Sequence, residues 1–426
     1  MKCDFDIVVV GAGPAGLSAA CEALALGKRV AIVDDNPRAG GQVWRQGPRT
    51  RIPAPMHRML SALNAADNAT IFASARVVAA PLPQALLLEC GDGTARYVTY
   101  GELILATGAR ERLLPFAGWT LPGVTGAGGL QALIKGGMPV RGERLVIAGT
   151  GPLLMAALAT AREAGAHVIA VVEQAPLPSV LRFGLSLAAT PLKVWQAMRL
   201  TRGFAGLSYW TGSVVREVRG EDRVRSVVVR RGPRDVEIEC DRVACGYGLV
   251  PNLTLALALE CEIRAGAIAV DDRQRTSMAH VWAAGECSGI GGAELARVQG
   301  RIAGLAASGA PVPAALVRAR ERWRRFGARV DAAFALGEAA RERPSDDTLL
   351  CRCEDVPFGA VAEHASWRDA KLHTRCGMGP CQGRICGTAA QVYFGWDSAA
   401  PRPPFSPARI GTLLEKAAPV ESGQTL

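Results

Sequence analysis

The chain begins with apolar runs that alternate with a glycine-rich turn. Residues 6–10 and 29–33 have the length and apolar content of buried strands, and residues 15–26 between them have those of a helix. A strand, a glycine turn, a helix and a second strand form a βαβ unit with parallel strands. The pattern therefore predicts an α/β protein that begins with a Rossmann-like unit.

The turn of this unit carries glycine where a bound dinucleotide requires it, in Gly11-Ala-Gly13-Pro-Ala-Gly16. Gly11 permits a tight turn, Gly13 lets a pyrophosphate approach the backbone, and Gly16 lets the helix pack closely on the strand. Asp34 closes the second strand 18 residues after Gly16, where a ribose-binding acid is expected. With strand, helix and acid in register, the sequence predicts a dinucleotide site here.

Three later segments extend this pattern: Gly40-Gly41-Gln42, the strand end Leu103 to Ala109, and the strand end Val281 to Glu286. In this order they resemble the two-dinucleotide-binding flavoproteins, which have the glutathione-reductase-like fold. The resemblance implies that FAD occupies the first unit. Glu286 stands where that family usually has Asp, so its contact with FAD is expected to be longer or water-mediated. The residues assigned to FAD are Gly11, Gly13, Pro14, Ala15, Gly16, Asp34, Asp35, Gly41, Gln42, Ala106, Thr107, Gly108, Gly285 and Glu286.

A second nucleotide-like unit follows. A strand from Leu145 ends at Gly149, a helix ends near Gly165, and a strand from His167 ends at Glu173. Gly149, Gly151 and Glu173 are the candidate residues for NAD(P)H or another nucleotide, and Glu173 favours NADH because it suits a free ribose hydroxyl. Leu154 replaces the third glycine and pushes the helix away from the strand. A working NADH site and a vacant or repurposed site remain equally weighted.

Composition fits a globular chain of two or three domains, since 426 residues include 49% hydrophobic and 21% charged residues. The net charge of +10 is dispersed over single arginines, and the basic stretch 318–329 is expected to be an exposed, solvated or subunit-facing helix that binds no nucleic acid.

No apolar run reaches the length of about 18 residues that a membrane span needs. Asp4 and Asp6 stand where a secretory signal needs positive charge, so a cytoplasmic protein is expected, with membrane association only through its electron acceptor.

Five of the 12 cysteines crowd into a short C-terminal segment. The C-x-C pair and the C-x-x-x-x-C spacings depart from paired zinc knuckles, and soft thiolates suit iron–sulfur centres, so a [2Fe–2S] cluster is favoured. Residues five apart on a helix differ by about 140°, so Cys381 and Cys386 cannot both face one cluster from a continuous helix. The helix is therefore expected to begin around Ile385. The chosen ligands are Cys351, Cys353, Cys381 and Cys386, with Cys376 as the alternative.

This segment resembles the bacterioferritin-associated-ferredoxin-like [2Fe–2S] domain, with the usual C-x-x-C widened. Together, the flavoprotein body and the motifs Cys-Arg-Cys-Glu and Cys-Gly-Met-Gly-Pro-Cys-Gln-Gly-Arg resemble the α (A) subunit of the opine oxidase, hydroxyproline (proline) dehydrogenase and hydrogen cyanide synthase family. The resemblance implies a β-subunit partner of the D-amino-acid-oxidase type, which oxidises a small amine or amino acid with its own FAD. A small third subunit is a further possibility. This chain is expected to take the electrons.

No catalytic residue is assigned, because none of the five histidines has a convincing partner in the sequence. Two other functions stay open: a self-contained NAD(P)H-dependent reductase and a non-catalytic redox scaffold. The expected domains are residues 1–130 (FAD-binding, first part), 131–272 (inserted NAD(P)-type domain), 273–343 (FAD-binding, second part, with the basic helix), 347–398 ([2Fe–2S] domain) and 399–426 (Pro-rich tail).

Overall fold

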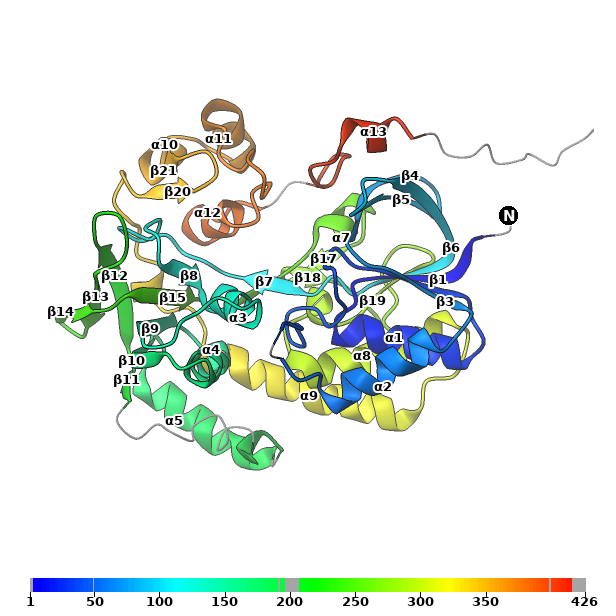
Figure 1. Cartoon of the computed structure of the whole chain (residues 1–426), viewed down its shortest axis with the longest axis horizontal. Helices are drawn as coiled ribbons and strands as arrows, with labels where there is room; N and C mark the ends of the chain where they lie inside the picture. The colour runs from blue at the N-terminus through cyan, green and yellow to red at the C-terminus, as the bar shows by residue number, and fades with distance from the viewer. Residues whose placement is uncertain (1–2, 49, 191, 196–206, 398–399, 416–426) are drawn as a thin grey trace, which may run out of the picture.

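The computed structural model describes residues 3–48, 50–190, 192–195, 207–397 and 400–415 (Figure 1). A seven-stranded sheet forms the first nucleotide-binding unit, with the strand order β3-β2-β1-β6-β5-β4 and β19 paired to β6. Strands β3, β2, β1 and β19 run parallel to the end of β6, whose first half is antiparallel to β5. The strands are β1 (Phe5–Val10), β2 (Val30–Val33), β3 (Ala69–Phe72), β4 (Ala75–Leu82), β5 (Ala85–Cys90), β6 (Ala95–Leu105) and β19 (Val281–Ala283).

Helices α1 (Pro14–Ala25), α2 (Ala54–Asn64) and α8 (Gly292–Ala307) accompany this sheet, and α1 and α8 lie side by side. Their close approach depends on two glycines of α8. A Cβ on Gly300 would lie 2.1 Å from the Ala15 carbonyl oxygen, and one on Gly304 would lie 2.3 Å from that of Ala19. The βαβ unit expected at residues 6–33 is confirmed, and the C-terminal part of the chain completes its packing.

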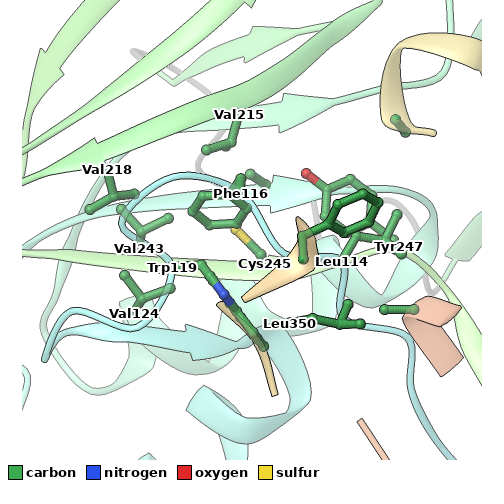
Figure 2. Close-up of a cluster of buried hydrophobic side chains, with 14 of the residues drawn as sticks. Leu114, Phe116, Trp119, Val124, Val215, Val218, Val243, Cys245, Tyr247 and Leu350 are labelled. Carbon is green, nitrogen blue, oxygen red and sulfur yellow. The ribbon is translucent and has the colours of Figure 1, made fainter. Parts of the chain in front are cut away.

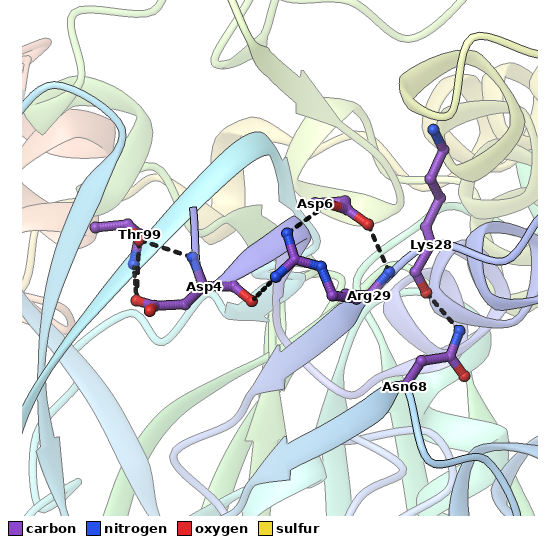
Figure 3. Close-up of polar contacts among 6 residues, drawn as sticks. All are labelled: Asp4, Asp6, Lys28, Arg29, Asn68 and Thr99. Carbon is purple, nitrogen blue, oxygen red and sulfur yellow. Dashed lines mark hydrogen bonds and ion pairs between the residues drawn. The ribbon is translucent and has the colours of Figure 1, made fainter. Parts of the chain in front are cut away.

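Polar contacts fix the edge of the sheet where β1 and β2 begin (Figure 3). The Arg29 guanidinium donates to Asp6 Oδ1 at 2.8 Å and to the Asp4 carbonyl, while the Arg29 amide donates to Asp6 Oδ2. Asp4 Oδ2 accepts from the amide and hydroxyl of Thr99 on β6. These contacts join the starts of β1 and β2 to the middle of β6.

The second nucleotide-like unit has a five-stranded parallel sheet in the order β11-β10-β9-β15-β8. Helices α3 (Ala127–Lys135) and α4 (Pro152–Glu163) pack against each other, and α5 (Leu177–Ser186) packs on α9 (Ala314–Ala333). A three-stranded meander adjoins the sheet: β12 (Ser213–Arg219), β13 (Ser226–Arg231) and β14 (Arg234–Glu239). The sheet strands are β8 (Val124–Gly126), β9 (Arg144–Gly149), β10 (His167–Glu173), β11 (Ser208–Trp210) and β15 (Arg242–Gly246).

One hydrophobic core joins this unit to the C-terminal module (Figure 2). Phe116, Trp119 and Tyr247 pack with Leu350 of the cysteine-rich segment, and the Trp119 indole donates to the Leu349 carbonyl at 2.6 Å. The module contains β20 (Leu349–Cys351), β21 (Val356–Pro357), α10 (Phe358–Ala362), α11 (Trp367–Thr374) and α12 (Cys386–Phe394). The helix expected to begin around Ile385 begins at Cys386, so that prediction is confirmed.

A two-stranded ribbon, β7 (Ala109–Glu111) with β16 (Leu249–Pro251), connects the two nucleotide-like units. Between β16 and β19 lie α7 (Thr254–Ala258), β17 (Ile263–Arg264) and β18 (Ala267–Ile268), and after β19 comes the short 3₁₀ helix η2 (Glu286–Ser288). Further 3₁₀ turns are η1 (Leu187–Ala189) and η3 (Glu338–Ala340), and α13 (Ile410–Leu413) is the last described helix.

The basic stretch is a helix, as expected, but it is not exposed on all sides. It lies within α9 (Ala314–Ala333), which packs on α8 and α5. Trp323 and Arg320 are buried, and the Arg320 guanidinium binds Asp272 at 2.6 Å. The expectation of an exposed helix does not hold for Trp323 and Arg320, because a local charge pattern does not show which helix face packs on another. Within the described ranges, no helix is long and apolar enough to span a membrane.

Candidate functional site

The first unit and its neighbours surround a cavity of about 850 Å³. All the residues predicted to hold FAD line this cavity except Gly16. They come from the glycine turn after β1, the end of β2, the loop 40–42, the end of β6 and the segment after β19. Tertiary structure thus brings five separate sequence segments to one place, which is the arrangement that a dinucleotide requires.

The three glycines of the first turn have different surroundings. A Cβ on Gly11 would lie 2.2 Å from the Ala106 carbonyl oxygen, and one on Gly16 would lie 1.8 Å from the Gly11 carbonyl oxygen. Both glycines are therefore required by packing. A Cβ on Gly13 would meet only Gly41, at 4.0 Å, and Gly13 lines the cavity. The open space at Gly13 fits a pyrophosphate beside the backbone at the start of α1.

Asp34 lies at the end of β2, as the sequence predicts, and is buried. Its carboxylate accepts hydrogen bonds from the amides of Ala12 and Asn36 and from the Asn36 side chain. The carboxylate is thereby held beside the glycine turn, and it also lines the cavity. This placement suits a ribose-binding acid.

Several cavity residues were not predicted from the sequence. Arg45 and Lys135 add positive charge, and Phe405 and Ser406 of the C-terminal tail line the same cavity. The tail is held there because the Phe405 amide donates to the Val78 carbonyl of β4. Arg110 and Glu111 also line the cavity, and their position directly after the Ala-Thr-Gly-Ala motif could have identified them in the sequence. The tail residues gave no such signal, because their contacts span more than 300 positions.

Two cavity carboxyls have raised pKa values because burial disfavours their charged form. Glu111 accepts hydrogen bonds from the amides of Gly128 and Gly129 at the start of α3, which partly oppose that shift. Glu286 stands next to Gly285. Both side chains are weaker acids than exposed carboxyls.

In the second unit, the glycine turn is covered by the chain itself. The Glu173 carboxylate is fully buried and accepts from the Thr150 hydroxyl and the Gly151 amide. The side chain of Phe334, just after α9, lies 3.6 Å from the position of a Cβ on Gly151. Gly149, Gly151 and Glu173 are thus together, as predicted, but the face of the turn that a pyrophosphate would use contacts Phe334.

The neighbouring Gln174 secures this covering segment. Its amide nitrogen donates to the Ala335 carbonyl at 2.9 Å, and its oxygen accepts from the Gly337 amide at 2.9 Å. Leu154, in the place of the third glycine, is fully buried in the core of this unit. We call residues 334–337 the covering segment below.

All five C-terminal cysteines gather in one module. The sulfur atoms of Cys351, Cys376 and Cys386 lie within 4.8 Å of one another and are buried. Cys353 and Cys381 are neighbours in the same module. Of the four chosen ligands, Cys351 and Cys386 belong to this buried group, together with Cys376, the alternative, whereas Cys353 and Cys381 do not. Such a set of thiols fits an iron–sulfur cluster or another soft metal.

Close backbone approach in this module depends on glycine. A Cβ on Gly379 would lie 2.4 Å from Cys353 Cβ, and one on Gly377 would lie 2.7 Å from the Trp367 indole. The backbone between Cys376 and Cys386 is not helical, since α12 starts only at Cys386.

The cysteine module adjoins the dinucleotide cavity. Arg384 and Ile385, between Cys381 and Cys386, line that cavity. Arg110 of β7 lines it too and donates to the Arg384 carbonyl at 2.9 Å and to the Thr388 hydroxyl of α12 at 3.2 Å. The same guanidinium donates to the Pro251 carbonyl. One side chain thus connects the cavity wall with the segment that carries two of the cysteines.

Three histidines have carboxylate partners that the sequence did not reveal. His280 Nδ1 lies 2.9 Å from Glu102, and His364 and His373 both contact Asp369. The partner of His280 is distant in sequence, whereas Asp369 is only five and four residues from His364 and His373. None of the three lines the dinucleotide cavity.

Comparison with known proteins places these features in a family. The pyridine nucleotide-disulphide oxidoreductase profile matches residues 5–303. The α (A) subunit of opine oxidase from Agrobacterium tumefaciens (strain Ach5) is 32% identical, over 96% of this chain and 88% of that protein. Hydrogen cyanide synthase subunit HcnB of Pseudomonas protegens is 33% identical over 89% of each chain. The crystal structure of L-proline dehydrogenase from P. horikoshii shares the fold, with a TM-score of 0.67, 17% identity and coverage of 96% of this chain and 79% of that one.

Proposed function

We propose a function on the premise that this chain belongs to the pyridine nucleotide-disulphide oxidoreductase family, together with the α (A) subunit of opine oxidase and the HcnB subunit of hydrogen cyanide synthase. It is the FAD- and [2Fe–2S]-containing electron-transfer subunit of a hetero-oligomeric dehydrogenase that acts on an amine or amino acid of the opine, hydroxyproline, proline or glycine type. A partner subunit of the D-amino-acid-oxidase type oxidises the substrate, and this chain accepts the electrons.

The observation that carries this proposal is the contact between the cysteine module and the dinucleotide cavity. FAD exchanges electrons in pairs or singly, and a [2Fe–2S] cluster exchanges one at a time. Arg384 and Ile385 separate two cysteines of the module and form part of the cavity wall. An electron that passes between a cluster in the module and a flavin in the cavity would cross this shared wall.

A self-contained NADH-dependent reductase is the second candidate, and the covering segment argues against it. A pyrophosphate at the second glycine turn would have to displace Phe334 from Gly151 and disrupt the hydrogen bonds from Gln174. Electrons are then better supplied by a protein partner. The names of the two relatives, each called a subunit, support a hetero-oligomer.

Anaerobic reduction of the FAD-loaded chain tests the source of the electrons. We expect neither NADH at micromolar concentration nor an amine to bleach the flavin of the isolated chain. The complex purified with its partner subunit should be bleached by one amine or amino acid from a screen. Rapid bleaching of the isolated chain by NADH would support the self-contained reductase, and unchanged spectra during turnover of the complex would support a scaffold.

Single Cys→Ser variants test the cluster and its ligands. Iron, acid-labile sulfide and the electron paramagnetic resonance signal after reduction should be lost in Cys351→Ser and Cys353→Ser, because each change removes a proposed ligand. With Cys381 and Cys386 as the remaining ligands, Cys376→Ser should retain the cluster. If Cys376→Ser lost the cluster and Cys386→Ser kept it, Cys376 would replace Cys386 as a ligand. Zinc in place of iron in anaerobically prepared wild type would overturn the choice of metal.

A further inference from the structure

Glu111, the last residue of β7, contributes a carboxyl to the wall of the dinucleotide cavity. This carboxyl accepts a hydrogen bond from the Gly128 amide at 2.6 Å and another from the Gly129 amide at 3.1 Å, both in the first turn of α3. The two glycines line the same cavity, and a Cβ on Gly129 would meet no atom within 4 Å. The carboxyl therefore lies where the start of α3 meets free cavity space.

Glycines at two strand ends make room for this carboxyl. A Cβ on Gly126, at the end of β8, would lie 2.3 Å from Glu111 Oε2. A Cβ on Gly246, at the end of β15, would lie 3.0 Å from Glu111 Oε1. The ends of three strands and the start of one helix thus enclose a single side chain, and a residue larger than glycine at position 126 would displace it.

Capping of α3 does not by itself require a carboxyl from β7. The residue before the helix is Gly126, which makes no side-chain cap, and Ser, Thr, Asn or Asp at that position would satisfy a helix amide locally. The chain instead uses a carboxyl that lies 17 positions before Gly128. Burial disfavours the charged form of this carboxyl and raises its pKa. Groups with such shifts in a cofactor cavity are often groups that exchange protons.

No cation forms an ion pair with Glu111 in the part of the chain that the structure describes. Of its neighbours on β7, Arg110 donates to oxygens of the ribbon and the cysteine module, and Arg112 lines another cavity. The cation of α3 is Lys135, at the far end of that helix. From β15, Glu111 faces the Cys245 thiol, whose pKa is raised by burial and secondly by the charge of Glu111, so that this thiol stays protonated. The protonation of Glu111 therefore depends on what occupies the cavity.

The flavin ring has a defined share of this cavity. Gly13 suits the pyrophosphate of FAD and Asp34 suits a ribose, and both residues belong to the first unit. The rest of the wall comes largely from β7, α3, α4 and the cysteine module. The ring is therefore expected in the part of the cavity where Glu111 lies.

We propose that Glu111 takes up one proton each time FAD in this cavity is reduced and releases it when the electrons leave, an inference that rests on the function proposed above. FAD that accepts two electrons and one proton carries one additional negative charge. A carboxylate beside that charge is repelled by it and takes up a second proton, so two electrons and two protons enter together. When the two electrons pass singly to a [2Fe–2S] cluster, the flavin releases one proton and Glu111 releases the other.

Infrared difference spectroscopy of the FAD-loaded full chain tests the proposal, with an electrode as the source of electrons in place of the partner subunit and an amine. On reduction, the wild type should gain the C=O band of a protonated carboxyl, and this band should shift in D₂O. Glu111→Gln should lack the band. Glu286→Gln is the matched control, because it changes the other cavity carboxyl whose pKa is raised by burial, and it should keep the band.

The midpoint potential of the bound FAD provides a second measure near neutral pH. Two protons per two electrons change the reduction equilibrium about a hundredfold per pH unit, or about 60 mV, and one proton changes it about tenfold, or about 30 mV. The potential should fall with rising pH along the steeper slope in the wild type and along the shallower one in Glu111→Gln. A wild-type spectrum without the carboxyl band would overturn the proposal, as would a band and slope that persist in Glu111→Gln. A chain that binds no FAD would overturn the proposed function as well, so flavin content distinguishes the two failures.

Discussion

Gly13 and Gly16 lie three residues apart in the same turn, yet a side chain at each would have different consequences. At Gly16 a Cβ would clash with the backbone of Gly11, whereas at Gly13 it would enter open cavity space. Folding therefore depends on Gly16, and binding depends on Gly13. The structure separates two roles that the sequence motif presents together.

This separation makes Gly13→Val a specific test of the FAD site. We expect the variant to fold with a melting temperature close to that of the wild type and to lose most of its flavin, because the side chain occupies the space beside the backbone that a pyrophosphate needs. Flavin content per chain and thermal unfolding measure the two effects. Gly184→Val, at a helical position of α5 with no atom near its Cβ, is the control and should keep its flavin. Full flavin content in Gly13→Val would show that the cofactor lies elsewhere.

Asp6 gives a prediction about pH at the same scale. The hydrogen bonds from Arg29 lower the pKa of the Asp6 carboxyl below its usual value. A lowered pKa in the folded state stabilises the protein above the pKa of the unfolded chain, and this contribution is lost as the pH falls through the folded value. Asp6→Asn should therefore lower the urea midpoint at neutral pH.

The effect should be small and salt-dependent because both side chains are more than one-third exposed. The gap between wild type and Asp6→Asn should shrink as the pH is lowered to about 3, below the usual Asp pKa. Asp222→Asn, at an exposed loop carboxylate, serves as the control. A gap that is constant from neutral to acidic pH would show that Asp6 acts through packing instead of charge.

At the scale of elements, the covering segment lies against the glycine turn of the second Rossmann-like unit, where a nucleotide would otherwise bind. The strand, turn, helix and acid of the second unit are all formed, but the turn contacts residues that follow α9. Gln174 supplies the hydrogen bonds that fasten this segment to the unit. The unit thereby anchors the chain that leads to the cysteine module.

We expect Gln174→Ala to loosen that connection. Loss of the buried amide leaves the Ala335 carbonyl and Gly337 amide without their partner, at a cost of about 1–3 kcal/mol. Limited proteolysis should then cut between α9 and η3 faster than in the wild type. Gln131→Ala, which removes one hydrogen bond to Thr160, should leave that cleavage unchanged. If the protease cut Gln174→Ala no faster than Gln131→Ala, Phe334 alone would hold the segment.

At the scale of the whole molecule, Arg110 connects the flavin cavity, the inter-domain ribbon and the cysteine module. Burial lowers the pKa of its guanidinium, but the group stays charged at neutral pH and donates to backbone and hydroxyl oxygens from three segments. The position of the module against the cavity therefore depends on one side chain as well as on the shared hydrophobic core.

Arg110→Gln should slow electron exchange between the two centres with both cofactors retained. We expect the flavin and cluster contents to match the wild type and the rate of cluster reduction after rapid mixing with a chemical reductant of the flavin to fall severalfold. Arg352→Gln, an exposed arginine of the same module that packs on Trp119, is the control. If the rate of cluster reduction were unchanged in Arg110→Gln, Arg110 would have no role in electron transfer between the two centres.

The sequence by itself determined the strand–turn–helix–strand order that opens each nucleotide-like unit, and a set of residues of which all but Gly16 line the first cavity. Hydrophobic period, glycine turns and terminal acids are local features, and a βαβ unit places its turn and its acid at the same sheet edge whatever surrounds it. The same reasoning correctly placed the start of α12, because helical geometry limits where Cys381 and Cys386 can point.

Only the tertiary structure decided which sites are open and what they adjoin. Phe334 covers the turn at Gly151, Phe405 lines the first cavity, and Arg110 reaches the module some 270 positions away. The grouping of Cys376 with Cys351 and Cys386 was likewise settled by folding. Contacts between distant segments depend on the packing of whole elements, and no local pattern of residues encodes which loop or helix end will lie over a given turn.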